Sequence, residues 1–399
     1  MKTPQRNQKG INLALDCRYV QGGFPGIGRY TYNLAAALAE LETVPPFKLN
    51  LIYNPSLPDN RHNLRELSNL FPERVKLAET TARPFSPAEQ WQLPLLAKRE
   101  KFDLWHAPYY VRPYLLPCAS IISLHDLIGK RLPQTLPSNK ARVAFEVTTR
   151  LALAASSKII APSESTRRDI IKCYGISSER IKTILEGVEK KFKPVESPEE
   201  RAQIQARLGL PENYLLYVGI NKPHKNLNRL IEAFALFRWR NPDSRIELVM
   251  AGKEDPRYSP VIKAQIKNLG LEKYTHSLGE VTDEDLIKIY GCARLFVMPS
   301  LYEGFGLPLL EAQACGVPVI CSGNSSLPEV GGNHVPTFDP YDIISMANAI
   351  EKILKSEELI AQQREAGLAR AKTLTWKKAA ASGFELYLET LREKNLGFL

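Results

Sequence analysis

The sequence is poor in features that cross-link a protein or anchor it in a membrane. Cysteine accounts for 6 of the 399 residues, and no two cysteines form a Cys-x-x-Cys pair. Most of them lie in apolar runs, which favours reduced, buried thiols over a disulfide framework or a zinc site. No stretch of about 18 consecutive apolar residues occurs, so no transmembrane helix is predicted. The apolar stretch Ile11–Leu15 is too short for a signal-peptide core, and we therefore expect a cytoplasmic protein.

Signals for a metal or for nucleic acid are also lacking. The histidines and cysteines form no cluster with the spacing of metal ligands, so we expect neither a metal nor a tightly bound cofactor. The basic residues lack the interleaved aromatic side chains of a nucleic-acid platform, which argues against nucleic acid as a partner.

Net charge, by contrast, is plentiful and unevenly distributed. The chain carries +10 overall. Residues 1–191 hold 28 Lys and Arg against 17 Asp and Glu, a net +11, whereas residues 192–399 hold 25 against 26, a net −1. A basic half attracts anionic partners such as phosphates or an acidic membrane surface, although dispersed solvated charges would give the same total.

A regular alternation of short apolar runs and longer amphipathic stretches begins near the start of the chain. Buried parallel strands joined by helices give this pattern, so the sequence predicts a doubly wound α/β sheet. A helix is expected over Gly28–Glu40. The expected strands of the first half are Ile11–Leu15, Leu49–Tyr53, Leu104–His106, Ile121–Leu124 and Lys158–Ala161.

The alternation restarts after Phe192–Glu200, a polar segment with two prolines that is typical of a linker. We therefore expect two Rossmann-like domains that face one another across a cleft, over residues 1–192 and 193–373, with a separate C-terminal helix over residues 374–399. The expected strands of the second domain are Tyr214–Gly219, Arg245–Ala251, Leu295–Met298 and Val317–Ser322. The expected helices are Asn226–Trp239, Leu307–Cys315, Ile343–Leu354, Ser356–Thr373 and Trp376–Glu393.

The strongest motif spans Met298–Ile320, where a strand is followed by a glycine loop and a helix. Gly304 and Gly306 remove side chains where a ligand could approach the backbone. The free N–H groups at the start of the helix favour an anion such as a diphosphate. Glu311 lies about one turn into the helix, where its carboxylate can accept hydrogen bonds from a ribose diol. Glu303 precedes the glycines and is suited to sugar hydroxyls.

The spacing Glu303-(x7)-Glu311 in this context resembles the signature of the family 4 retaining glycosyltransferases, which have the GT-B fold. The segment around Lys225 resembles a loop of that family in which a basic pair contacts the donor diphosphate. Lys225 matches the lysine of that pair, whereas His224 stands where many relatives have arginine. The resemblance implies that Lys222 or a protonated His224 supplies the second cation.

Further segments resemble the same family in the same order, so that the resemblance covers nearly the whole chain. Gly279 and Val281 lie in a loop similar to the one that holds the nucleotide base through backbone groups. Ser325–Gly331 and Phe338–Pro340 resemble segments near the donor and before the last helices. The donor-binding residues implied by the resemblance are Gly26, Gly28, His224, Lys225, Gly279, Val281, Glu303, Gly304, Phe305, Gly306, Leu307 and Glu311.

The glycine-rich stretch Gly22–Tyr30 follows the first expected strand and opens a helix. A dinucleotide fingerprint would require a third glycine and an acidic residue at the end of the second strand, where Asn54 stands instead, so a nicotinamide site is disfavoured. The family resemblance implies that this loop, through Gly26 and Gly28, closes over the donor phosphates and the acceptor.

Two histidines stand at the ends of expected strands. His125 matches the family's histidine beside the donor sugar, and the following Asp126 either orients it or caps the next turn. No carboxylate is an obvious covalent nucleophile. The resemblance implies retention by same-face attack on an oxocarbenium-like centre, in which the enzyme stabilises the leaving diphosphate and screens water. The implied catalytic residues are His125, Lys225 and Glu303. The implied acceptor-side residues are Arg29, His106, Asp126 and Ser163.

The resemblance also suggests a substrate class. The strings Gly26–Tyr30 and Leu124–Leu127 are most similar to mannosyltransferases that build O-antigen or capsule, which favours GDP-mannose over a UDP-sugar as donor. The acceptor would be a saccharide or a lipid-linked saccharide, with peripheral contact to the anionic inner face of the cell membrane. The segment Leu374–Ala381 resembles the final helix that returns to the first domain. Two alternatives are a sugar-nucleotide 2-epimerase and a non-catalytic sugar-nucleotide-binding protein.

Overall fold

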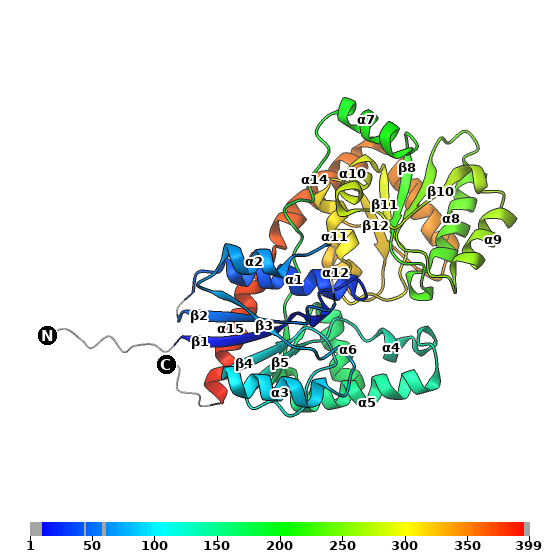
Figure 1. Cartoon of the computed structure of the whole chain (residues 1–399). Coiled ribbons are helices and arrows are strands. Elements are labelled where there is room, and N and C mark those ends of the chain that lie inside the picture. The colour runs from blue at the N-terminus through cyan, green and yellow to red at the C-terminus, as the bar shows by residue number, and fades with distance from the viewer. Residues whose placement is uncertain (1–9, 44, 58–60, 395–399) are drawn as a thin grey trace. The chain divides into compact units, whose positions relative to one another are not determined.

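The computed structural model describes residues 10–43, 45–57 and 61–394. The chain divides into two compact units. Unit 1 contains the described residues up to Lys130, Leu136–Glu186 and those from Trp376 onward, and unit 2 contains Arg131–Thr135 and Gly187–Thr375. Each unit has its own sheet with helices packed against it (Figure 1).

The sheet of unit 1 has seven parallel strands in the order β3-β2-β1-β4-β5-β6-β7. Its central strands are the short apolar runs of the sequence, and they are buried on both faces as the alternation predicts. The strands are β1 (Ile11–Asp16), β2 (Phe47–Tyr53), β3 (Val75–Glu79), β4 (Leu104–Ala107), β5 (Ala119–Ser123), β6 (Lys158–Ala161) and β7 (Ile181–Thr183).

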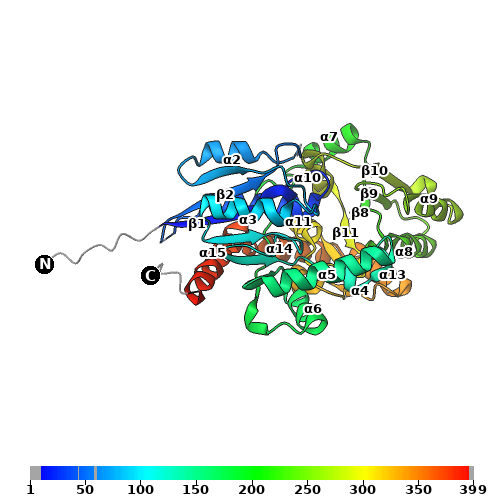
Figure 2. The same cartoon turned by 60° about the horizontal axis from the view of Figure 1, so that its bottom comes forward.

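Helices cover both faces of this sheet. Trp105 and Ile122 of the strands share a core with Leu93 of α3, Leu153 of α5 and Ile170 of α6. Figures 1 and 2 show α3 and α5 on the same face. On the other face, α1 packs along α15, the last helix of the chain. The helices are α1 (Pro25–Ala39), α2 (Leu64–Leu70), α3 (Glu89–Glu100), α4 (Ile128–Arg131), α5 (Asn139–Ala155), α6 (Glu164–Tyr174) and α15 (Trp376–Glu393).

The sheet of unit 2 has six parallel strands in the order β10-β9-β8-β11-β12-β13. In chain order this is the 3-2-1-4-5-6 arrangement of a doubly wound nucleotide-binding sheet, in which ligands bind at the carboxyl ends of the strands. The strands are β8 (Tyr214–Val218), β9 (Glu247–Ala251), β10 (Thr275–Gly279), β11 (Leu295–Met298), β12 (Val319–Ser322) and β13 (Thr337–Phe338).

One face of this second sheet packs against α8, α9 and α13, whose side chains Phe234, Ile262 and Ile350 join Leu248 and Val297 of the strands in one core. The helices of unit 2 are α7 (Pro198–Leu208), α8 (Leu227–Arg240), α9 (Ser259–Asn268), α10 (Asp283–Cys292), α11 (Leu307–Ala314), α12 (Leu327–Gly331), α13 (Ile343–Leu354) and α14 (Glu357–Thr373).

One sequence-based expectation about chain organisation is wrong. The segment Phe192–Glu200 is not a free linker, because Phe192 is 5% exposed against the rest of unit 2 and α7 already begins at Pro198. Apart from the short segment Arg131–Thr135, the chain passes between units after Glu186 and again after Thr375, a few residues from the predicted boundaries. Within the described residues, no helix is both long and apolar enough to cross a membrane.

Candidate functional site

Glycines stand at the carboxyl ends of three neighbouring strands of unit 2. Gly219 follows β8, Gly252 follows β9 and Gly279 ends β10. The N–H of Gly252 donates to the carbonyl of Gly279 at 2.8 Å, so these strand ends lie side by side. A Cβ atom on Gly252 would lie 2.3 Å from the carbonyl oxygen of Gly219, and its φ is +139°. Only glycine fits there, because the backbones of the two strand ends lie in close contact.

A buried ion pair stands at the same edge. Lys225 Nζ donates to Glu303 Oε1 at 2.6 Å, and the two side chains are 19% and 10% exposed. Burial alone would raise the pKa of Glu303, but the charge and hydrogen bond of Lys225 outweigh it and hold that pKa below its usual range. Residues far apart in the chain, both predicted to bind the donor, therefore form one charged group.

The surroundings of His224 disfavour a charged ring. Its ring is 6% exposed, and burial together with the charges of Lys225 and Lys222 lowers its pKa to about 4. The ring is therefore neutral at neutral pH, which argues against the expected substitution of a protonated histidine for arginine. Its Nδ1 atom is buried and has no hydrogen-bond partner within the part of the chain that the structure describes.

The start of α11 has the geometry that the motif predicts. Gly306 caps the helix with φ +103°, and a Cβ atom there would lie 2.6 Å from Cδ2 of Leu327. Pro308 occupies the first turn. The preceding loop is fixed because Ser326 Oγ donates to the carbonyls of Glu303 and Phe305, at 3.0 and 2.9 Å. The N–H groups of this helix start are thus held at the carboxyl edge of the sheet.

The other predicted donor residues of unit 2 differ in accessibility. Glu311 is 3% exposed and accepts a hydrogen bond from Tyr290 Oη at 3.1 Å, so one carboxylate oxygen already has a protein partner. The side chain of Phe305 is buried, whereas those of Val281 and Leu307 are half-buried. Gly304 is buried within the loop. A ribose contact by Glu311 stays a prediction.

In unit 1, His125 lies between two acceptors. Its Nε2 is 2.9 Å from the carbonyl oxygen of Pro108, and its Nδ1 is 3.2 Å from Oε1 of Glu186. Because the carbonyl can only accept, Nε2 carries a hydrogen, and the contact at Nδ1 needs a further proton on the ring or on the carboxyl group. Asp126 instead caps the next turn through the N–H of Ile128 at 2.8 Å. Glu186 is thus an acidic partner of His125 that sequence analysis missed.

His106 is placed differently from the acceptor-side expectation. Its ring is 1% exposed, with Nδ1 2.7 Å from Tyr387 Oη and Nε2 2.8 Å from Ser123 Oγ. Burial, with a smaller contribution from His125, lowers its pKa to about 3. Both nitrogens are engaged inside unit 1, so this geometry favours a structural role.

The remaining predicted residues of unit 1 lie at helix starts. Ser163 is buried and caps α6 by accepting from the N–H of Thr166 at 3.1 Å. Gly26 is exposed in the first turn of α1, and Arg29 is half-buried one turn further on. Gly28 is buried, and a Cβ atom there would lie 2.9 Å from the carbonyl oxygen of Tyr19. Close packing of α1 is sufficient to explain that glycine.

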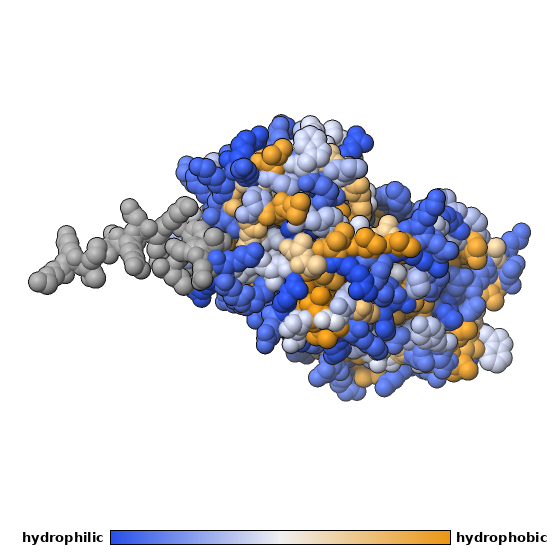
Figure 3. All heavy atoms as spheres, turned by 90° about the horizontal axis from the view of Figure 1, so that it is seen from below, coloured by the Kyte–Doolittle hydropathy of each residue, from blue (hydrophilic) through white to orange (hydrophobic). Residues whose placement is uncertain are grey.

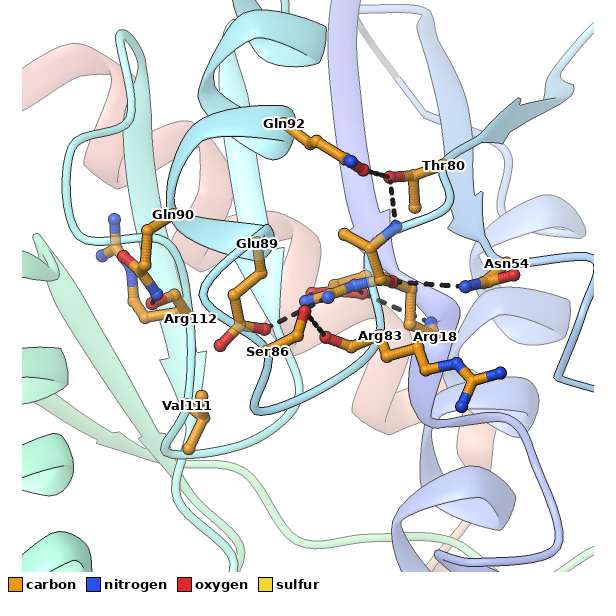
Figure 4. A network of polar contacts seen from close by, with 12 residues as sticks. Arg18, Asn54, Thr80, Arg83, Ser86, Glu89, Gln90, Gln92, Val111 and Arg112 are labelled. Carbon is orange, nitrogen blue, oxygen red and sulfur yellow. Dashed lines mark hydrogen bonds and ion pairs between the residues drawn. The ribbon is translucent and has the colours of Figure 1, made fainter.

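A buried ionic network, which no motif indicated, holds the loops beyond β1 and β3 (Figure 4). Arg18 donates to both oxygens of Asp16 at 2.8 and 2.7 Å and to Glu89 at 3.1 Å. Burial raises the pKa of Glu89 to about 7 despite the nearby Arg18. Asp16 ends β1 and Glu89 begins α3, so the network fixes the start of α3 at the carboxyl edge of the sheet.

The fold and these sites define a class of protein that comparison with known families identifies. Residues 25–192 match the family model described as Glycosyltransferase Family 4, and residues 199–370 match that described as Glycosyl transferases group 1. O-antigen chain mannosyltransferase B of Escherichia coli is 30% identical over 375 residues, which cover 91% of this chain and 95% of that protein. The chain belongs to the group 1 glycosyltransferases of family 4.

Solved structures agree on the architecture. Sucrose-phosphate synthase from Thermosynechococcus elongatus superposes with a TM-score of 0.71 at 20% identity, over 96% of this chain and 100% of that one. HepE from Anabaena, solved in complex with UDP and glucose, has a TM-score of 0.71 at 19% identity over 96% and 100% of the two chains. The predicted GT-B fold is confirmed.

Proposed function

We propose that this glycosyltransferase is a retaining hexosyltransferase that moves mannose from GDP-mannose to a saccharide or lipid-linked saccharide during polysaccharide synthesis. The observation that carries the donor assignment is the Lys225–Glu303 pair at the carboxyl edge of a nucleotide-binding sheet, beside the start of α11. The E. coli relative, named as a mannosyltransferase of O-antigen chains, supports the sugar and the pathway class.

The chemistry follows from the charges at this edge. Lys225 and the N–H groups at the start of α11 would neutralise the diphosphate as it leaves, and thus stabilise the transition state rather than the bound sugar. Glu303 would accept hydrogen bonds from the sugar hydroxyls while its other oxygen stays paired with Lys225. His224 would present the Nδ1 of a neutral ring, which has no hydrogen-bond partner among the described residues and is suited to one directed hydrogen bond to the donor. His125 would act near the sugar, and none of these roles calls for a metal.

A UDP-sugar is the alternative donor. It is supported by the similarity in fold to HepE, whose structure contains UDP and glucose. The other two alternatives differ from a transferase in their products. A 2-epimerase releases a free epimer without an acceptor, and a non-catalytic sugar-nucleotide-binding protein releases no product.

The decisive experiment measures transfer directly. The protein is incubated with GDP-mannose or UDP-glucose and a panel of mannosides with a hydrophobic aglycone. Nucleotide release and product are quantified, and the anomeric configuration of the product is read by NMR. We expect mannosyl transfer with the donor's configuration. An inverted product would refute the retaining mechanism, and a free epimer or binding without turnover would refute the transferase assignment.

We further propose that the protein works in the cytoplasm in peripheral contact with the anionic inner membrane face, where a lipid-linked acceptor would reside. The net +11 of residues 1–191 supports this, because acidic lipids attract basic surfaces by about 1 kcal/mol per Lys or Arg close to them.

A further inference from the structure

Helix α5 carries apolar side chains on two opposite sides. Its inner side places Phe145, Ala152 and Leu153 in the buried core of unit 1. A surface helix normally turns a polar face to water. The outer side of α5 instead presents Val143 and Val147 to solvent, and it continues with Leu151 at the same spacing.

These three outer residues form a continuous stripe. Val143, Val147 and Leu151 are 63%, 49% and 45% exposed, and a spacing of four residues places them along one line on a helix. Ala144 and Ala154, on the same side, are also exposed. Figure 3 shows a hydrophobic band on the face seen from below, where Figure 1 shows α5. A contiguous apolar strip on a protein surface is typical of a site that contacts a protein partner or a membrane.

The stripe is bordered by positive charge. Lys140, Arg142 and Arg150 are exposed on α5. The acidic residue of this helix, Glu146, already accepts from Lys130 at 3.0 Å and from Arg150 at 2.7 Å. The outer side of α5 therefore combines apolar side chains with a surplus of cations.

The combination of apolar side chains and cations favours a membrane over a second copy of the chain as the partner of this surface. Two copies of the chain that met through this stripe about a two-fold axis would bring the surplus cations of both copies into one interface, where like charges repel one another. An acidic lipid surface satisfies both features, since the apolar side chains enter the boundary between headgroups and acyl chains while the cations meet the phosphates. Trp91 and Leu95, 58% and 59% exposed, add apolar side chains from α3 on the same face of the sheet.

We propose that the outer side of α5 is the surface by which this protein docks, flat and reversibly, on an anionic bilayer. The inference rests on the proposed lipid-linked acceptor and names the part of the molecule that would approach it. A helix of 17 residues is about 25 Å long, enough to lie along the interface but with too narrow an apolar stripe to insert without charge attraction.

The test is sedimentation of the full chain with vesicles of phosphatidylglycerol and phosphatidylcholine, or of phosphatidylcholine alone. The wild type should bind the anionic vesicles, and 0.5 M NaCl should weaken binding. Val147→Glu should lower the partition coefficient at least tenfold. The matched control is Val261→Glu, which places the same charge at a 57% exposed valine on α9 of unit 2 and should change binding less than twofold.

The outcomes separate this proposal from the proposed function. Equal vesicle binding by Val147→Glu and the wild type would refute the α5 surface. A concentration-dependent dimer that Val147→Glu dissolves, without vesicle binding, would also refute it in favour of a second copy. If the wild type binds no vesicle but transfers sugar to soluble mannosides, the docking proposal fails and the transferase assignment stands. Unchanged mannosyl transfer by Val147→Glu to soluble mannosides shows that the variant is folded.

Discussion

Lys225 is the residue whose removal should affect donor binding most directly. Charge-assisted hydrogen bonds contribute about 1.5–3 kcal/mol, so Lys225→Ala should weaken GDP or UDP binding by roughly tenfold to a hundredfold. The variant also leaves Glu303 buried without its cation, which should raise the pKa of that carboxyl group. Isothermal titration calorimetry measures the affinity. Lys267→Ala, at an exposed position on α9, is the control, and equal affinities for both variants would contradict the role of Lys225.

Glu186 should act through His125, whose Nδ1 it faces at 3.2 Å. Glu186→Gln keeps the shape but removes the acid, so the ring loses the partner that fixes its proton. We expect kcat to fall at least about tenfold, with the donor KM little changed. Glu186→Asp should recover part of the rate. Glu179→Gln, at an exposed site, should behave as wild type. An unchanged kcat in Glu186→Gln, or equal changes in kcat and donor KM, would leave this residue a purely structural role.

Sequence patterns identified Glu303 as a site residue but did not identify Glu186. Glu303 lies in a motif whose spacing has a local cause, since a strand, a glycine loop and a helix follow one another in the chain. Glu186 is 61 residues from His125 and stands in no motif, so its role depends on where the sheet places the end of β7. The burial of His106 could not be predicted from the sequence either, because its partner Tyr387 is 281 residues away in the chain.

At the scale of elements, the start of α11 depends on one glycine. Gly306→Ala places a Cβ atom at φ +103° and 2.6 Å from Leu327, so the helix start must shift. The strain should lower the free energy of unfolding of unit 2 by about 1–3 kcal/mol and remove most of the thermal stabilisation by nucleotide. Gly270→Ala is the matched control, since Gly270 also has a positive φ but has open space around it.

The Gly270→Ala control separates the effect of backbone strain on stability from the effect of the α11 helix start on nucleotide binding. Gly270→Ala should lose about 1 kcal/mol of stability yet keep the full shift with nucleotide. If Gly306→Ala keeps that shift too, the N–H groups of α11 do not hold the diphosphate.

The buried contacts of His106 with Ser123 of β5 and Tyr387 of α15 should make unit 1 sensitive to acid. Burial lowers the pKa of His106 to about 3, whereas the unfolded chain takes up this proton near pH 6.5. Stability from the neutral ring is therefore complete above about pH 6.5 and is lost as the pH falls toward 3, at about 1.4 kcal/mol per pH unit. His106→Gln should reduce the slope of the free energy of unfolding against pH by that amount between pH 6 and 4.5. Unfolding is followed by the fluorescence of the buried Trp105 and Trp376.

The same comparison has a control in unit 2. His276→Gln should leave the slope of unit 1 unchanged. A His106→Gln variant with the wild-type slope would show that the ring is already protonated in the folded state.

The strands that sequence analysis did not predict share one position in the sheets. They are β3 and β7 at the edges of the first sheet and β10 and β13 at the edges of the second. Central strands are covered on both faces and become continuous apolar runs, whereas an edge strand such as Thr275–Gly279 is half-exposed and polar. Apolar runs in a sequence therefore mark the central strands of a parallel sheet but not its edge strands.

For the whole molecule, the sequence indicated two α/β units but not which distant segments complete them. Unit 1 is closed by the last helix, whose Phe384, Tyr387 and Leu391 are buried against the N-terminal part of the chain. That return was expected only from the family resemblance, because the amphipathic pattern of α15 does not specify the unit against which it packs.

Two separate cores imply that nucleotide should stabilise one of them selectively. At a hundred times its Kd, GDP or UDP adds about 2.7 kcal/mol to the unit that binds it, or roughly 5–10 °C for a unit of this size. The proposed contacts with the nucleotide and its diphosphate lie mainly in unit 2.

The buried Trp105 and Trp376 report on unit 1, whereas Trp239 of unit 2 is 80% exposed and changes little on unfolding. Saturating nucleotide should therefore raise one calorimetric transition while the fluorescence transition stays within about 1 °C. Equal shifts in both signals would contradict binding through unit 2 alone and would show that the two cores unfold as one.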